Sequence, residues 1–192
     1  MPQNQPLLDY LKTRRSVTLP FLKDPGPSEA ELQELLTIAT RVPDHGKIAP
    51  WRLVLYRGDA RQVIGTRLAE IAGRRNPGIE EAALEIERKQ FLPAPLTVGV
   101  ISAPIAHVKA PRWEQQLSAA CVCLNLLNGA EALGYAGHWV TRWFAYDPEA
   151  RAMLGAREGE AFAGFVHIGT PSARMEDRPR PNLADVVSEW RA

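Results

Sequence analysis

A long uncharged stretch, residues 115–130, is the strongest constraint on how this chain can fold. Its small and apolar residues are spread around the whole circumference of a helix instead of forming one stripe, and they are Leu117, Ala119, Ala120, Cys121, Val122, Cys123, Leu124, Leu126, Leu127 and Ala130. A helix that is apolar on every side has to be buried on every side. Gly134 then suits a left-handed cap, and Tyr135 to Thr141 has strand-forming residues. We therefore predict a central helix that leads into a central strand.

The charge balance and the cysteines narrow the function classes. Lys and Arg total 23 against 22 Asp and Glu, a net charge of +1, which offers no electrostatic case for binding nucleic acid or an acidic membrane. The uncharged stretch carries Gln, Ser and Asn and is shorter than the ~20 apolar residues of a membrane span. Two cysteines, two positions apart, imply no disulfide framework, and the N-terminus lacks the pattern of a secretion signal, so we expect a cytoplasmic protein.

Helices and strands are expected to alternate in a single α+β domain over residues 1–192. The patterns predict helices over residues 7–12, 28–40, 60–72, 80–90, 111–134 and 148–154, and strands over residues 51–56, 96–103, 135–141 and 161–169. The densely charged helix over residues 80–90 is interpreted as a surface helix or a mobile lid. A chain of this length has little with which to cover an all-apolar helix, so we expect a homodimer with that helix at the interface.

Two short motifs could carry chemistry. Arg14, Arg15 and Ser16 follow the first helix, where two guanidinium groups and a hydroxyl suit a phosphate, although a solvated basic helix end is the simpler interpretation. Arg41 and His45 lie on a proline-bounded loop of the kind that often carries functional groups, with an ordinary surface turn as the alternative.

Other reaction classes lack support in the sequence. The four histidines have no spacing typical of a metal site, so no metal is predicted. The motifs of serine hydrolases, phosphate-binding loops and Rossmann dinucleotide sites are absent. The Cys121 and Cys123 pair, inside an apolar helix, indicates packing rather than redox chemistry.

In their order along nearly the whole chain, these pieces resemble the FMN-dependent nitroreductase family. The matching segments are Arg14-Arg15-Ser16, Arg41-Val-Pro43 leading to Pro50-Trp51, Arg112-Trp113-Glu114, Gly134-Tyr-Ala-Gly137-His-Trp139 and Gly164-Phe-Val-His-Ile-Gly169-Thr-Pro171. The chain is similar to the small branch that has Pro-Asp-His where other members have Pro-Ser-Ser. The resemblance implies a mixed sheet flanked by helices and a homodimer whose C-terminal tails reach across to the partner, with two FMN sites at the interface.

The resemblance also implies roles for particular residues. Arg14, Arg15 and Ser16 would hold the phosphate, the ribityl chain and the pyrimidine edge of FMN, and Arg41 and His45 would approach the same flavin from the other subunit. The remaining expected contacts are Trp139, Val140 and Thr141 along the flavin, Gly129 and Gly134 near the nicotinamide donor, and Arg178 or Arg180 at the phosphate. The sequence departs from the family at Lys47 and Ala49, where many members have Asn and Gln.

The activity implied by this resemblance is hydride transfer from NADH or NADPH through FMN to a nitroaromatic, a quinone or a similar small acceptor, in ping-pong order. The cofactor would do the chemistry, and His45 is a candidate proton donor. Two alternatives remain: a flavin-binding storage or sensor protein without turnover of an external acceptor, and an enzyme that modifies the flavin itself.

Overall fold

The computed structural model describes residues 2–191, which divide into two compact units. The larger unit comprises residues 16–173, and the smaller one combines residues 2–15 with residues 174–191. The smaller unit contains helices α1 (Gln5–Thr13) and α7 (Leu183–Val186). A single domain over the whole chain stays a prediction.

The larger unit contains the sheet and most of the helices. Its helices are α2 (Glu29–Ala39), α3 (Ala60–Arg75), α4 (Glu81–Arg88), α5 (Arg112–Ala132) and α6 (Pro148–Met153), with 3-10 turns η1 (Leu19–Phe21) and η2 (Trp143–Ala145). Its strands are β1 (Leu22–Lys23), β2 (Trp51–Arg57), β3 (Leu96–Ser102), β4 (Ala136–Val140) and β5 (Ala161–Pro171). The α+β class is confirmed, and each predicted helix and strand is present with small shifts at its ends.

The five strands form one sheet in the order β1-β5-β3-β2, with β4 also paired to β5. Each strand pair in residues 2–191 is antiparallel, so these strands do not form the mixed sheet that the resemblance implied. The expectation that β4 is a central strand is also wrong, because β5 borders β1, β3 and β4 whereas β4 pairs with β5 alone among the described strands. The longer and largely buried β5 takes the central place.

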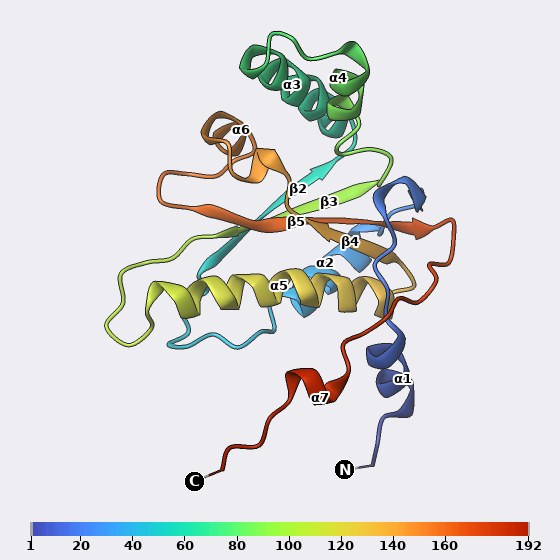
Figure 1. Ribbon diagram of the computed structural model, residues 1–192, viewed down its shortest axis with the longest axis vertical. Coiled ribbons are helices and arrows are strands. Elements are labelled where there is room, and N and C mark those ends of the chain that lie inside the picture. Colours follow the sequence, from blue (N-terminus) through green and yellow to red (C-terminus); the bar gives the residue numbers. More distant parts are fainter. Residues whose placement is uncertain (1, 192) are drawn as a thin grey trace. The chain divides into compact units, whose positions relative to one another are not determined.

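Helices cover both faces of the sheet (Figure 1). Helices α2 and α5 pack on one face over a core that includes Leu35, Val98 and Leu126. Helices α3 and α6 cover the other face, where Phe91 and Phe165 belong to a second core. Strands contribute to both cores because alternate side chains point to opposite faces. The larger unit is therefore a three-layer structure.

Local sequence rules explain the ends of α2 and α5. Ser28 accepts a hydrogen bond from the backbone N–H of Glu31, whose carboxylate accepts one from the backbone N–H of Ser28, which is a capping box. Helix α5 ends at Ala132, and Gly134, the residue after the C-cap Leu133, has a φ of +83° that suits glycine. The backbone N–H groups of Gly134 and Tyr135 bond the carbonyls of Glu131 and Ala130, closing a Schellman motif.

One side of α5 lies at the surface of the described chain, which corrects the expectation of burial on every side. Its inner side packs on the sheet and on α2. On its outer side the exposed fractions are 66% for Trp113, 46% for Leu117 and 43% for Leu124. These three side chains, here called the α5 stripe, follow one another at helical spacing. The sheet buries half of this helix and leaves an apolar stripe uncovered.

Candidate functional site

The two predicted phosphate residues Arg14 and Arg15 lie in the smaller unit together with the C-terminal tail. Arg15 donates a hydrogen bond to the backbone carbonyl of Glu176, and its guanidinium is 3.9 Å from the carboxylate of Asp177. Arg180 donates to the carbonyl of Arg14 at 3.3 Å and is 3.7 Å from Asp177. Two guanidinium groups, those of Arg15 and Arg180, thus share the neighbourhood of one carboxylate.

This cluster has a guanidinium nitrogen without a hydrogen-bond partner in the described residues, which an anion could accept from. The Nε atom of Arg14 is buried and has no hydrogen-bond partner within residues 2–191. Buried donors are normally paired, and a guanidinium offers its donors in a geometry that suits phosphate oxygens. Arg180, one of the two tail candidates, belongs to the cluster, and both it and the other candidate, Arg178, are exposed. The residues present here fit a phosphate group.

Ser16 begins the larger unit beside β4. The backbone N–H of the next residue, Val17, donates to the carbonyl of Gly137 at 3.1 Å. Val140 is half-buried at the end of β4, and Thr141 is exposed directly after it. The predicted residue Ser16 and the predicted flavin strand therefore lie together, although they are far apart in the sequence.

Trp139 is held against β5 by a close backbone approach. Its indole Nε1 donates to the carbonyl of Ala163 at 3.2 Å, and the side chain remains 36% exposed. A Cβ at Gly164 would lie 2.1 Å from the same nitrogen, so glycine is required at that position. The strand thus presents an oriented aromatic ring at the surface.

Two histidines face each other across β4 and β5. His138 pairs in register with His167, whose Nδ1 is 2.7 Å from the hydroxyl of Thr97. Burial, with smaller effects of His138 and Arg142, lowers the pKa of His167 to about 3. Burial first and Arg142 second also lower the pKa of His138. The strand pair therefore carries a neutral imidazole at position 167 above about pH 3.

The loop over residues 41–50 is a tight, strained turn. The Asp44 carboxylate accepts hydrogen bonds from the backbone N–H groups of Ile48 at 3.1 Å and Ala49 at 2.8 Å. Lys47 and Ala49 have φ values of 56° and 50°, which cost a residue with a side chain about 1–2 kcal/mol each. Both residues stand where the resemblance implied a departure from the usual pattern, and both have a left-handed backbone.

Three polar residues of α5 fasten this loop to the helix. Ser118 donates to the carbonyl of Pro43 at 2.5 Å. Asn125 donates to the carbonyls of Ile38 at 3.1 Å and Arg41 at 3.0 Å. The His45 Nδ1 is 2.7 Å from a carboxylate oxygen of Glu114.

None of these three α5 residues was predicted from the sequence to have a role in the site. Glu114, Ser118 and Asn125 are four and seven positions apart, so they share one face of the helix. Polar side chains at that spacing in an otherwise apolar helix could have indicated that a loop is hydrogen-bonded to this face of α5.

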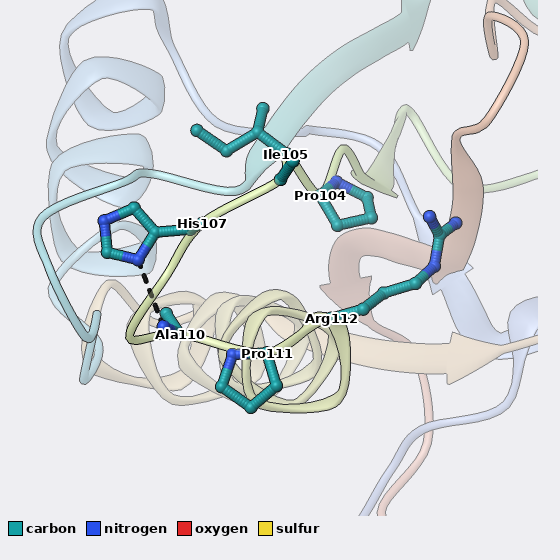
Figure 2. Close-up of a pocket in the computed structure, with 7 residues that line it drawn as sticks. Pro104, Ile105, His107, Ala110, Pro111 and Arg112 are labelled. Carbon is teal, nitrogen blue, oxygen red and sulfur yellow. Dashed lines mark hydrogen bonds between the residues drawn. The ribbon is translucent and has the colours of Figure 1, made fainter.

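A shallow, open pocket of about 420 Å³ lies beside this loop (Figure 2). It is lined by residues from the end of β3 to the start of α5, namely Pro104, Ile105, Ala106, His107, Ala110, Pro111 and Arg112. The His107 Nδ1 accepts hydrogen bonds from the backbone N–H groups of Lys109 and Ala110. A Cβ at Gly46 would lie 3.2 Å from the His107 ring, which shows that pocket and loop are neighbours.

The structure gives the two predicted glycines different roles. A Cβ at Gly129 would lie 2.9 Å from Leu35 and 3.2 Å from Ile38, so this buried glycine allows α5 to approach α2 closely. Gly134 is exposed, and no atom lies within 4 Å of where its Cβ would be. Packing explains Gly129, whereas Gly134 leaves open space beside β4.

The predicted site residues of the larger unit lie at different points along α5. His45 is bonded to Glu114 near the start of the helix and the Arg41 carbonyl to Asn125 in its second half, whereas Ser16 and Trp139 belong to the region that follows its end. At 1.5 Å per residue, Glu114 is roughly 30 Å from Gly134 along the helix and Asn125 about 14 Å. Along this axis His45 therefore lies far from β4 of its own chain.

Two further properties of the described residues bear on the site. Within residues 2–191, the His, Cys, Asp and Glu side chains do not form a group of three or more that could hold a metal ion. In the same residues, no helix combines the length and apolar content that crossing a membrane requires.

Comparison with known proteins matches residues 11–170 to the model of the family described as "Nitroreductase family". The chain is 31% identical over 167 residues to "Putative NAD(P)H nitroreductase YdjA" of Escherichia coli (strain K12), covering 87% of this chain and 89% of that protein.

Solved structures share the fold. A nitroreductase-like family protein from Bacillus cereus has a TM-score of 0.79 at 22% identity, with 98% of each chain covered. A nitroreductase with bound FMN from Bacteroides fragilis NCTC 9343 has a TM-score of 0.70 at 20% identity, covering 96% of this chain and 98% of that one. The chain described here belongs to the nitroreductase family.

Proposed function

We propose that this protein is an FMN-dependent oxidoreductase that uses NADH or NADPH to reduce a nitroaromatic, a quinone or a similar small acceptor. Family membership supports the reaction class, and the relative from Escherichia coli carries NAD(P)H nitroreductase in its name. The nitroreductase from Bacteroides fragilis, which shares the fold, has FMN bound. Bound FMN would accept hydride from the nicotinamide and pass it to the acceptor in ping-pong order.

The observation that carries this proposal is the separation along α5 between His45, which is bonded to Glu114, and the region of Ser16 and Trp139 that follows the end of the helix. A two-fold axis through the α5 stripe would set two copies of the helix side by side in opposite directions. The start of one α5, with its loop over residues 41–50, then lies near the end of the other, with β4. A homodimer thereby assembles two complete sites, each made by two chains. The exposed Leu117 and Leu124 supply the apolar surface that such an interface buries.

Each group of residues has a role in this dimer. Arg14 and Arg15, with Arg180, bind the phosphate, and Ser16 orients the adjoining part of the cofactor. Trp139, Val140 and Thr141 line one side of the ring. Arg41 and His45 reach the same ring from the partner subunit, and the C-terminal tail crosses to that subunit.

Gly134 leaves room for the nicotinamide donor, since nothing lies near its Cα on the side-chain side. Gly129 has no place in the proposed site because it packs against α2. The cofactor supplies the redox chemistry, and the protein binds, orients and shields it.

The test is spectroscopic. The purified protein is incubated with FMN, freed of excess cofactor, and mixed anaerobically with NADPH or NADH. We expect a yellow dimer that bleaches with a nicotinamide donor and recovers its colour when a nitroaromatic or a quinone is added. A protein that binds no FMN contradicts the proposal, and one that bleaches but does not recover with these acceptors is a flavin-binding protein of another kind.

A further inference from the structure

The loop that carries His45 is prepared to hold its imidazole in one orientation. Asp44 ties the turn through two backbone hydrogen bonds, and Ser118 and Asn125 fasten the preceding backbone to α5. The strained φ values of Lys47 and Ala49 persist because these bonds hold the turn. A loop with so many fixed points positions a side chain more accurately than a free surface turn does.

The partner of the imidazole fixes which ring nitrogen carries hydrogen. The His45 Nδ1 lies 2.7 Å from Oε2 of Glu114. An ionised carboxylate only accepts hydrogen bonds, so Nδ1 carries the hydrogen and donates it. The side chains of His45 and Glu114 are 53% and 46% exposed, so the pair is open at the surface. The other nitrogen, Nε2, remains available to a bound molecule.

A neighbouring histidine shows the opposite arrangement. The His107 Nδ1 accepts from the backbone N–H groups of Lys109 at 3.3 Å and Ala110 at 3.0 Å, and the second bond is drawn in Figure 2. Neutral His107 therefore carries its hydrogen on Nε2. The two histidines beside Gly46 thus differ in tautomer because their partners differ. The Nδ1 of His45 faces a carboxylate that accepts a hydrogen bond, whereas the Nδ1 of His107 faces two backbone N–H groups that donate.

We propose that Glu114 is a positioning residue that holds His45 with Nδ1–H turned to the carboxylate, so that Nε2 delivers a proton to the acceptor during its reduction. This inference rests on the proposed function. A quinone takes up one hydride and one proton to give a hydroquinone. The hydride comes from the reduced cofactor and the proton from the Nε2–H of the imidazolium. The Nε2–H bond breaks, an O–H bond forms, the imidazole is left neutral, and water returns the proton.

The charged surroundings of His45 favour this role. Its own loop brings Arg41, Asp44 and Lys47, α5 brings Glu114, and the segment before α5 brings His107. The Asp44 carboxylate is occupied by backbone N–H groups. Glu114 is the carboxylate bonded to the ring, so it is the group that fixes the orientation of the imidazole.

The first test reads the tautomer directly and needs no cofactor. Nitrogen-15 NMR of histidine-labelled protein is recorded for the wild type, for Glu114→Ala and for Glu70→Gln, with His45→Ala used for assignment. Glu70 is an exposed residue of α3, so its variant controls for the loss of a carboxylate elsewhere. We expect neutral His45 to be protonated at Nδ1 in the wild type and in the control, and to shift toward Nε2 in Glu114→Ala. An unchanged tautomer in Glu114→Ala overturns the inference.

The second test separates proton delivery from a general loss of structure. The FMN-loaded, donor-reduced protein is reoxidised by a quinone, which needs protons, or by ferricyanide, which takes electrons alone. We expect Glu114→Gln to slow quinone reduction by about 10-fold and His45→Ala to slow it by about 100-fold, since general acids typically contribute 10²-fold or more. Reoxidation by ferricyanide should slow far less than reduction of the quinone, because ferricyanide takes up no proton.

The outcomes distinguish a failure of proton delivery by His45 from a failure of the proposed function. If the variants slow reoxidation by the quinone and by ferricyanide equally, or slow neither, proton delivery by His45 is overturned. The proposed function still stands in that case, provided that the protein binds FMN and is reduced by NADH or NADPH. A protein that takes up no FMN, or is not reduced by either nicotinamide, overturns the proposed function and proton delivery together.

Discussion

Replacing Glu160 by Gln should remove one of the stronger electrostatic contributions to the stability of the fold. The Arg52 guanidinium donates to both carboxylate oxygens of Glu160, from Nε at 2.8 Å and from Nη2 at 2.5 Å, and so joins β2 to the loop before β5. The Glu160 side chain is 11% exposed and also accepts the backbone N–H of Arg157 at 2.8 Å. This geometry is the bidentate form in which ion pairs are strong.

The size of the effect follows from the pKa of Glu160. The hydrogen bonds from Arg52, opposed by burial and assisted by the N–H of Arg157, lower this pKa from 4.5 to about 2. Each pKa unit corresponds to ~1.4 kcal/mol, so the carboxylate contributes about 3 kcal/mol to the free energy of unfolding at neutral pH. Because the pKa is lower in the folded state, this contribution is fully present above about pH 4.5. It is lost as the pH falls toward 2.

The assay is urea unfolding at fixed protein concentration, at pH 7 and at several values down to pH 3. We expect Glu160→Gln to lower the free energy of unfolding by about 2–3 kcal/mol at pH 7, with a difference from the wild type that shrinks below pH 4.5. Glu149→Gln is the control, because its pair with Arg74 has side chains 59% and 57% exposed, and it should change stability by less than ~0.5 kcal/mol. A Glu160→Gln loss no larger than the control, or one that stays constant down to pH 3, would refute the reasoning.

Three further changes test packing and assembly. Leu124→Glu places a charge in the α5 stripe beside Leu117, and sedimentation should show monomers where the wild type gives dimers, with the circular dichroism of the fold retained. Gly164→Ala puts a methyl group 2.1 Å from the Trp139 indole nitrogen, so tryptophan fluorescence should shift and the free energy of unfolding should fall by about 2 kcal/mol. An unchanged fluorescence spectrum would mean that the indole lies elsewhere. Ser28→Ala removes the cap of α2 and should cost about 1 kcal/mol in thermal or urea unfolding, whereas a loss below ~0.3 kcal/mol would count against the capping box.

Features governed by nearby residues could be predicted from the sequence. Ser28 and Glu31 are three positions apart, and their spacing alone indicated the start of α2. Gly134 indicated the end of α5 because a left-handed residue there needs no distant partner. The apolar run of β3 likewise predicted a strand, and all seven of its residues are buried.

Features governed by distant residues could not be predicted in this way. The two residues of β1 form a strand because they pair with Thr170 and Pro171, and nothing in Leu22 and Lys23 themselves indicates it. β4 has a good strand sequence, yet its place in the sheet depends on which neighbours β5 accepts. Position in a sheet is a property of long-range pairing, which local propensity does not encode.

The candidate site shows the same division. Arg14, Arg15, Arg41 and His45 could be recognised from the sequence as candidate site residues because of their side-chain chemistry. The partner of His45 could not, because Glu114 is 69 positions away and meets it only when α5 packs beside the loop. Gly129 was expected near the nicotinamide donor from the family resemblance, and the structure shows that α2 packs closely against it.

The most direct test of a site shared between two chains is complementation of FMN binding by mixed variants. Arg15→Glu and Arg41→Glu should each abolish binding, since each spoils both sites of its own homodimer. When the two variants are unfolded together and refolded as a mixture, about half of the dimers contain one chain of each kind, and each of these has one intact site. We predict recovery of about a quarter of the wild-type FMN binding, measured by flavin absorbance after gel filtration. No recovery in a mixture that forms such dimers would contradict the shared site, because it would mean that Arg15 and Arg41 serve the same flavin from one chain.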